Sequence, residues 1–158
     1  MATAKTPTAS LTEMVQFVLP NDANALGFIL GGTVMHLIDI AGAISATRHA
    51  RSQIVTASVD DLQFLHPIRV GDMITLRAWM NATFNTSMEV EVEVCSEEGL
   101  TGERRTTSRA FLTFVAVDKN GHPRSVPPLV SETDEERARA QGAQVRREER
   151  LKRRKASA

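Results

Sequence analysis

The fold is decided by residues 24–49, which read Asn24-Ala-Leu-Gly27-Phe-Ile-Leu-Gly31-Gly32-Thr-Val-Met-His36-Leu-Ile-Asp39-Ile-Ala-Gly42-Ala-Ile-Ser-Ala-Thr-Arg48-His49. A glycine-rich turn leads directly into a stretch whose apolar residues recur every three or four positions, which is the period of a helix. These residues are Val34, Leu37, Ile38, Ala41 and Ile44. Further apolar residues flank this stripe and leave almost no polar face, so the sequence predicts one long buried helix.

A single acidic residue, Asp39, stands in the middle of this apolar helix. No Lys or Arg lies three or four positions away, and only His36 is within reach along the helix. A buried carboxylate costs free energy unless a specific partner or a function accounts for it. We therefore look for the chemistry of the protein at Asp39.

The composition is that of one globular domain. The 158 residues are 42% hydrophobic and 24% charged, and 19 basic residues balance 19 acidic ones. A net charge of zero gives no electrostatic reason to expect a nucleic-acid partner. The single cysteine excludes an internal disulfide, and no apolar run is long enough for a signal peptide or a membrane span. We expect a cytoplasmic protein.

After the helix the apolar period changes to two, which is typical of β-strands. We expect strands at residues 11–19, 55–65, 73–84, 88–94 and 104–117, joined by short turns. The adjacent Asp60 and Asp61 suggest a bulge in the second of these strands. Strict alternation of apolar residues with Glu over residues 88–94 predicts a strand with one dry face and one wet face.

The two ends of the chain read differently from its centre. Residues 1–10 are small and polar, and we expect them to be disordered. Residues 131–158 begin as a helix with an acidic first turn and become rich in Arg and Lys. Because this tail has almost no apolar stripe, we expect a solvated helix that frays. The predicted domain covers residues 11–130, and its class is α+β, with one long helix lying across an antiparallel sheet.

Several motifs follow one another along the chain. They are Asn24-x-x-Gly27-x-x-x-Gly31-Gly32, Met35-x-x-Ile38-Asp39-x-Ala41-Gly42, Ala46-x-Arg48-His49, Val55-Thr-Ala-Ser-Val59-Asp60, Phe64-x-x-Pro67-Ile68-x-x-Gly71-Asp72, Thr86-Ser87-Met88-Glu89-Val90 and Thr113-Phe114-Val115-Ala116. Together they resemble the hotdog-fold acyl-coenzyme A thioesterases, in particular the cytosolic long-chain acyl-CoA hydrolases and their small bacterial relatives. The resemblance runs from about residue 11 to about residue 136.

The resemblance implies a hotdog fold, in which a curved five-stranded antiparallel sheet wraps a long central helix. It also implies a homodimer with a shared ten-stranded sheet, assembled further into hexamers as trimers of dimers. The active-site Asn and the helical Asp of this family fall on Asn24 and Asp39. Some relatives contain two hotdog repeats and carry one of these residues in each half. A single-domain chain with both is expected to form complete sites at a homodimer interface.

The activity that the resemblance implies is hydrolysis of fatty acyl-CoA, which needs an activated water and a place for charge on the carbonyl oxygen. We expect Asp39 to be the general base, because desolvation makes a carboxylate a stronger base. Direct attack by Asp39 to form an anhydride stays open as a variant. Asn24 can orient the water or donate to the oxyanion, and the backbone amides of Gly31 and Gly32 can form an oxyanion hole.

Each of these residues also has a purely structural interpretation. Asp39 could be hydrogen-bonded to His36 or to a partner subunit, and Asn24 could cap a turn. The paired glycines Gly31 and Gly32 could serve only a tight turn between strand and helix.

Coenzyme A carries phosphates, so basic residues are expected near the entrance of the site. Arg48, Arg104 and Arg105 are the candidates, and the basic tail is a weaker one. Thr86 and Ser87 match family positions near the pantetheine arm, although both could simply cap a turn. We expect no cofactor, because coenzyme A is part of the substrate, and no metal, because the four histidines lack metal-site spacing.

Other activities have less support. The chain has no Gly-x-Ser-x-Gly elbow of a serine hydrolase, and Cys95 has no evident His partner. The main alternative is a non-catalytic acyl-CoA-binding sensor. A hydratase of the same fold is a further one, although such enzymes typically pair a His with the acidic residue. Release of free thiol distinguishes a hydrolase from both.

Overall fold

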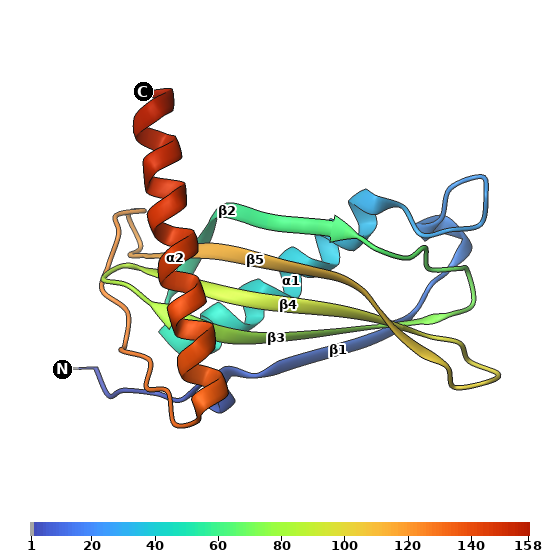
Figure 1. Ribbon diagram of the computed structural model, residues 1–158, viewed down its shortest axis with the longest axis horizontal. Helices are drawn as coiled ribbons and strands as arrows, with labels where there is room; N and C mark the ends of the chain where they lie inside the picture. The colour runs from blue at the N-terminus through green and yellow to red at the C-terminus, as the bar shows by residue number, and fades with distance from the viewer. Residues whose placement is uncertain (1) are drawn as a thin grey trace.

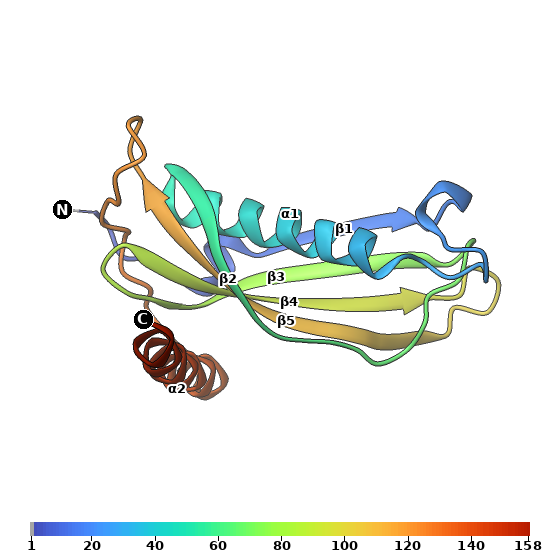
Figure 2. The ribbon, with the colours of Figure 1, turned by 90° about the horizontal axis from the view of Figure 1, so that it is seen from above.

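The computed structural model describes residues 2–158 and shows one antiparallel sheet with a long helix on one face and a second helix on the other (Figures 1 and 2). The elements are β1 (Thr12–Phe17), α1 (Gly31–Ala50), β2 (Gln53–Phe64), β3 (Met73–Thr83), β4 (Ser87–Glu97), β5 (Arg104–Val117) and α2 (Asp134–Ser157), with short 3-10 helices at Pro7–Ser10 and Pro20–Asp22. The sheet order is β1-β3-β4-β5-β2, so β1 and β2 form its edges. The predicted five strands around one helix are confirmed. Within residues 2–158, no helix is both long and apolar enough to cross a membrane.

Helix α1 packs against the sheet through one face only. Val34, Leu37, Ile38 and Ala41 are buried against the strands. Gly42 allows the close approach, because a Cβ at this position would lie only 3.0 Å from the buried ring of Phe114. The helix and the sheet therefore fit together at a point where any larger side chain would force them apart.

The opposite face of α1 is uncovered in the single chain, which differs from the prediction of a helix buried all round. Met35 is 47% exposed, and Gly31, Gly32 and His36 are exposed beside it. The physical reason is that one sheet can cover only one side of a helix. Further exposed apolar side chains lie beside this face at Leu30, just before the helix, and at Val59, Phe64 and Leu65, on or just after β2.

The face of β4 that the sequence predicts to be wet is buried beneath α2, so this prediction was wrong. Glu89 and Glu91 are only 1% and 5% exposed. Arg146 of α2 binds Glu89 with a shortest N–O distance of 2.6 Å, and Asn81 donates to both carboxylates at 3.0 Å. A second cation, Arg109, lies 3.4 Å from Glu91. Charge pairing, which hydrophobic alternation does not reveal, allows this face to be dry.

Helix α2 is an ordered helix that crosses the sheet, in contrast to the predicted solvated and fraying tail (Figure 1). The guanidinium of Arg139 lies 4.8 Å from the ring centre of Trp79, and that of Arg146 lies 3.7 Å from the ring centre of Phe111. Ala143 between them is fully buried. Stacked guanidinium groups and their aliphatic stems thus replace the apolar stripe that the sequence lacks.

Residues 5–10 are ordered, whereas the sequence predicts disorder over residues 1–10, of which Met1 lies outside the described residues. The backbone of Lys5 donates to Pro128 O at 3.0 Å and accepts from Val130 N at 2.9 Å. Its ammonium donates to the carbonyl of His49 at 2.7 Å, at the end of α1. Composition does not anticipate this order, because every partner is a backbone group far away in the sequence.

We expect the protein to lose stability below neutral pH because of His49. This ring is fully buried, its Nε2 donates to Pro127 O at 2.7 Å, and desolvation lowers the pKa of the imidazole. The unfolded chain therefore takes up a proton that the folded chain refuses, starting near the ordinary pKa of about 6.5. Stability is fully present above that pH and is lost as the pH falls below it.

Urea unfolding of the wild type and of His49→Gln checks this expectation. The Gln amide can still donate to Pro127 but cannot titrate. Between about pH 7.5 and pH 5.5 the free energy of unfolding should fall more in the wild type than in the variant. Parallel pH profiles would show that His49 is not the responsible group.

Candidate active site

A pocket of about 370 Å³ opens beside the N-terminal end of α1. Its wall is largely apolar, with a few polar side chains placed among the apolar ones, as is usual for small-molecule sites. The lining residues are Asn24, Phe28, Ile29, Gly31, Val34, Phe64, Leu65, His66, Pro67, Ile68 and Ser108. The structure thus brings together two of the predicted site residues, Asn24 and Gly31.

Asn24 organises the loop that enters α1. Its Oδ1 accepts from the backbone N–H of Leu26 at 2.9 Å and from that of Phe28 at 3.2 Å. Gly27 closes the turn with a φ of +83°, a conformation that favours glycine. The Nδ2 group of Asn24 has no hydrogen-bond partner within residues 2–158. The residue therefore caps the turn with its oxygen and keeps two N–H donors for a ligand.

The first turn of α1 offers backbone amides to the same pocket. The residue before the helix, Leu30, has no side chain that could cap them, and its carbonyl accepts from Thr33 N and Val34 N. Gly31 lines the pocket and the neighbouring Gly32 is exposed. The start of a helix carries a partial positive charge, so these amides can bind an oxygen that becomes negative.

Asp39 lies further along α1 and does not line this pocket. From Gly31 to Asp39 the helix advances about 12 Å. The carboxylate is half-buried, and its Oδ1 accepts a hydrogen bond of 2.7 Å from the hydroxyl of Thr56 on β2. The observed partner within the chain is therefore Thr56, whereas the sequence analysis considered His36 or a partner subunit. A single chain does not bring Asn24 and Asp39 into one pocket.

Thr56 is a candidate that the sequence analysis did not single out. It stands in the Val55–Asp60 motif, but no local pattern shows which strand hydroxyl faces the helix. The pairing of β2 with β5 places Thr56 opposite Phe114, whose ring packs against α1. Only the register of two strands distant in sequence reveals that Thr56 reaches Asp39.

The residues predicted to bind coenzyme A are divided between opposite ends of the sheet. Thr86 and Ser87 stand at the start of β4, whereas Arg104 and Arg105 stand across from its end. An eleven-residue strand such as β4 spans roughly 35 Å. Arg105 lines a polar hollow that shares Pro67 with the pocket of Asn24. No single chain can place all of them on one ligand.

The arginines in this set already have partners within the chain. Arg48 donates to Leu11 O at 3.0 Å and to the Thr12 hydroxyl at 3.1 Å, and so ties the end of α1 to β1. Arg104 lies 2.6 Å from Glu97, and Arg105 lies 3.3 Å from Glu103. These last two pairs are exposed, so solvent weakens them and a phosphate can compete.

Comparison with known proteins places these features in a family. The sequence model of the thioesterase superfamily matches residues 26–103. The uncharacterized acyl-CoA thioester hydrolase YkhA of Bacillus subtilis is 45% identical over 119 residues, which are 75% of this chain and 69% of that protein. The cytosolic acyl coenzyme A thioester hydrolase of Mus musculus is 39% identical over 132 residues, or 82% of this chain. The chain spans only 35% of the mouse protein.

Solved structures agree with the sequence comparison over nearly the whole chain. A hexameric acyl-CoA thioesterase crystallised in its apo form has a TM-score of 0.92 and 43% identity, covering 96% of this chain and 97% of its own. The acyl-CoA hydrolase of Staphylococcus aureus, solved with butyryl coenzyme A and coenzyme A, has a TM-score of 0.90 and 36% identity, covering 98% and 94%. Alanine variants of the latter at an Asn, an Asp and a Thr have also been solved. Those three residues are spaced along its sequence as Asn24, Asp39 and Thr56 are along this one.

Two substitutions at Asn24 test whether its side-chain oxygen, which caps the turn, stabilises the fold. Asn24→Ala removes the oxygen that holds Leu26 and Phe28 and should lower the free energy of unfolding by about 1 kcal/mol. Asn24→Asp keeps an acceptor oxygen at the same place and should leave stability near that of the wild type. Urea unfolding of both variants measures this difference. Equal stability of the Ala variant and the wild type would show that the cap is unimportant.

Proposed function

Because this chain belongs to the thioesterase superfamily and to its acyl-CoA thioester hydrolases, we propose that it hydrolyses fatty acyl-CoA to a free fatty acid and coenzyme A, with Asp39 as the general base. The observation that carries this assignment is the hydrogen bond of 2.7 Å from Thr56 to Asp39. It holds Oδ1 of the carboxylate and leaves Oδ2 to take a proton from water. The water oxygen then bonds to the thioester carbonyl carbon, the C–S bond breaks, and Asp39 returns the proton to the sulfur, which leaves as the thiol of coenzyme A.

Charge on the carbonyl oxygen is met by donors at the start of α1. In this proposal the donors are the backbone amides of Gly31 and Gly32 and the Nδ2 group of Asn24, and the pocket lining of Asn24 and Gly31 supports it. Removing one such donor typically slows an enzyme by roughly a hundredfold to a thousandfold. The apolar wall of the pocket gives the acyl chain or the pantetheine arm a surface to pack against.

A complete site requires two chains in this proposal. The edge strand β2 has a free outer side, and exposed apolar residues on it continue onto α1. A second copy that pairs antiparallel along β2 joins two sheets of five strands into one of ten. Such a dimer covers the open face of α1 and carries Asn24 of one chain toward Asp39 of the partner subunit.

The same two-fold arrangement accounts for the divided coenzyme A residues. Antiparallel pairing of β2 places the Thr86–Ser87 end of one sheet beside the Arg104–Arg105 end of the other. Residues from both chains then line one entrance, whereas Arg48 is held against β1 at the other edge of the sheet. Assembly of the dimers into a hexamer is supported by a relative that is described as hexameric, and a cytoplasmic location by one that is described as cytosolic.

Other mechanisms have less support in the structure. Cys95 is half-buried, and burial raises the pKa of its thiol, which leaves little nucleophilic thiolate. A non-catalytic acyl-CoA-binding sensor would need the pocket but not the hydrogen-bonded carboxylate. A hydratase of this fold would be expected to pair the acid with a His, whereas the observed partner of Asp39 is Thr56.

We expect Asp39→Asn to lose most of kcat while it keeps its fold and its affinity for acyl-CoA. The amide is nearly isosteric and can still accept from Thr56, but it cannot take a proton from water. Thiol release from acyl-CoAs of short to long chain, measured for wild type and variant in parallel, gives both the rate and the chain preference. Calorimetric titration with acyl-CoA gives the affinity.

Three outcomes are informative. Turnover by the wild type alone supports the hydrolase with Asp39 as the base. Equal turnover in both proteins removes Asp39 from that role. Binding of acyl-CoA without thiol release from either protein would favour the sensor.

A further inference from the structure

We propose that α2 holds the bulged strand β2 in the register that brings Thr56 to Asp39, with Asp60 and Arg150 as positioning residues. The inference rests on the proposed role of Asp39 and concerns residues that do not touch the pocket. It assigns a function to the Asp60–Asp61 pair of the sequence and to the C-terminal helix.

Strand β2 is irregular at two places. Its pairing with β5 skips one residue, Ala57, between Thr56 and Ser58, and it shifts again between Asp60 and Gln63. The second irregularity is the bulge that the sequence predicts at the two Asp residues. Asp61 has a φ of +55°, a left-handed conformation that costs free energy for a residue other than glycine. Such backbone persists only where surrounding contacts fix it.

The first bulge decides which way the side chains of β2 point. In a regular strand, residues 56 and 60 would face the same side of the sheet, because side chains alternate. Here Thr56 pairs with Phe114, whose ring contacts α1, whereas Asp60 pairs with Phe111, whose ring lies under Arg146 of α2. The extra residue therefore sends Thr56 toward α1 and Asp60 toward α2.

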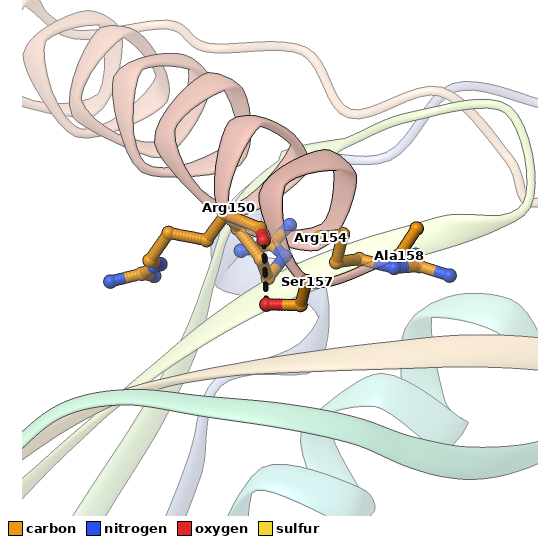
Figure 3. A pocket seen from close by; sticks show the side chains of 5 residues that line it. Arg150, Arg154, Ser157 and Ala158 are labelled. Carbon is orange, nitrogen blue, oxygen red and sulfur yellow. Dashed lines mark hydrogen bonds between the residues drawn. The ribbon is translucent and has the colours of Figure 1, made fainter.

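Asp60 forms the ion pairs that connect β2 to α2. Its Oδ2 lies 3.0 Å from Nη1 of Arg150, and the two side chains are only 12% and 14% exposed. Arg153 approaches the other carboxylate oxygen at 3.4 Å. Figure 3 shows Arg150 on the last turns of α2, near Arg154 and Ser157. The hydroxyl of Ser157 donates to Arg153 O at 3.0 Å and so satisfies a carbonyl in the last turn of the helix.

The helix itself is fixed independently of β2. Arg146 makes three hydrogen bonds of 2.6 to 3.2 Å to the buried Glu89 of β4. Arg139 is stacked on Trp79 of β3. The guanidinium of Arg150 is thus presented to β2 from a helix anchored on the centre of the sheet.

The two contacts on opposite faces of β2 depend on each other. If the bulge moved from Ala57 to the far side of Asp60, either Thr56 would turn away from Asp39 or Asp60 would turn away from Arg150. Within residues 2–158, β2 pairs with β5 alone, so before a second copy pairs with its outer side only one ladder opposes this slip. The Asp60–Arg150 pair therefore selects the register in which the carboxylate of Asp39 is held.

The test removes the ion pairs of Asp60 with α2 and keeps the contacts of Arg146 and Arg139 that hold α2 on the sheet. Arg150→Gln combined with Arg153→Gln should lower kcat by about tenfold with little change in KM, since small misplacements of catalytic groups cost rate rather than binding. Hydrogen exchange at the β2 amides should become faster in the same protein. Arg154→Gln combined with Lys155→Gln is the matched control, because it removes the same charge from the same helix without touching Asp60. It should keep the wild-type kcat.

Thr56→Val shows whether α2 affects the rate through the hydrogen bond from Thr56 to Asp39. If it does, adding the Arg150 and Arg153 substitutions to Thr56→Val should slow the enzyme no further. Rate losses that multiply in the combined protein would overturn the inference, as would an unchanged kcat after removal of both arginines. If Thr56→Val itself has the wild-type kcat, the proposed role of the Thr56–Asp39 bond fails instead. Thermal melts of each variant identify any general loss of folding.

Discussion

The half-buried carboxylate of Asp39 on α1 accepts a hydrogen bond of 2.7 Å from the hydroxyl of Thr56, and this bond fixes the orientation of the proposed base. This bond links α1, which carries Asp39, to the edge strand β2. The position of β2 depends in turn on a bulge at Ala57 and on the contact of Asp60 with α2. The geometry of one carboxylate therefore involves elements from most of the chain.

The second constraint is that one sheet covers only one side of a helix. Gly42 brings α1 close to Phe114, and the buried stripe of the helix runs from Val34 to His49. The remaining face carries Asp39 and the exposed Met35, next to the free edge of β2. A second copy of the chain would cover this face. It would also bring Asn24 of one chain near Asp39 of the other, although these two residues lie apart within one chain. The proposed dimer would thus cover the exposed face of the helix and complete the proposed site.

Local periodicity was sufficient to predict the strands and α1, because a repeat of two or of three to four residues reports directly on which side of an element is buried. The same reasoning misjudged β4 and α2 together. Glu89 and Glu91 read as a wet face, and Arg139 and Arg146 read as a solvated helix, yet these charged surfaces cover each other. Hydrophobicity cannot detect a contact made of ion pairs and stacked guanidinium groups.

Some residues of the candidate site could be predicted from local sequence and others could not. Asp39 was noticeable because it conflicts with an apolar helix, and the motifs around Asn24 and Gly31 carried a family resemblance. Thr56 and Asp60 were not identified, because their roles depend on the register of β2 against β5 and on a bulge that reverses the facing of the strand. Long-range pairing of this kind is absent from any local window of sequence.

The most direct test of the account is complementation between two inactive chains. Asn24→Ala and Asp39→Asn chains, co-expressed with different tags and purified as mixed oligomers, form dimers in which one of the two shared sites keeps both residues. We predict that thiol release from acyl-CoA returns to as much as about half of the wild-type rate per mixed dimer, although each parent alone is inactive. Mixed oligomers as inactive as both parents would contradict a site built from Asn24 of one chain and Asp39 of its partner.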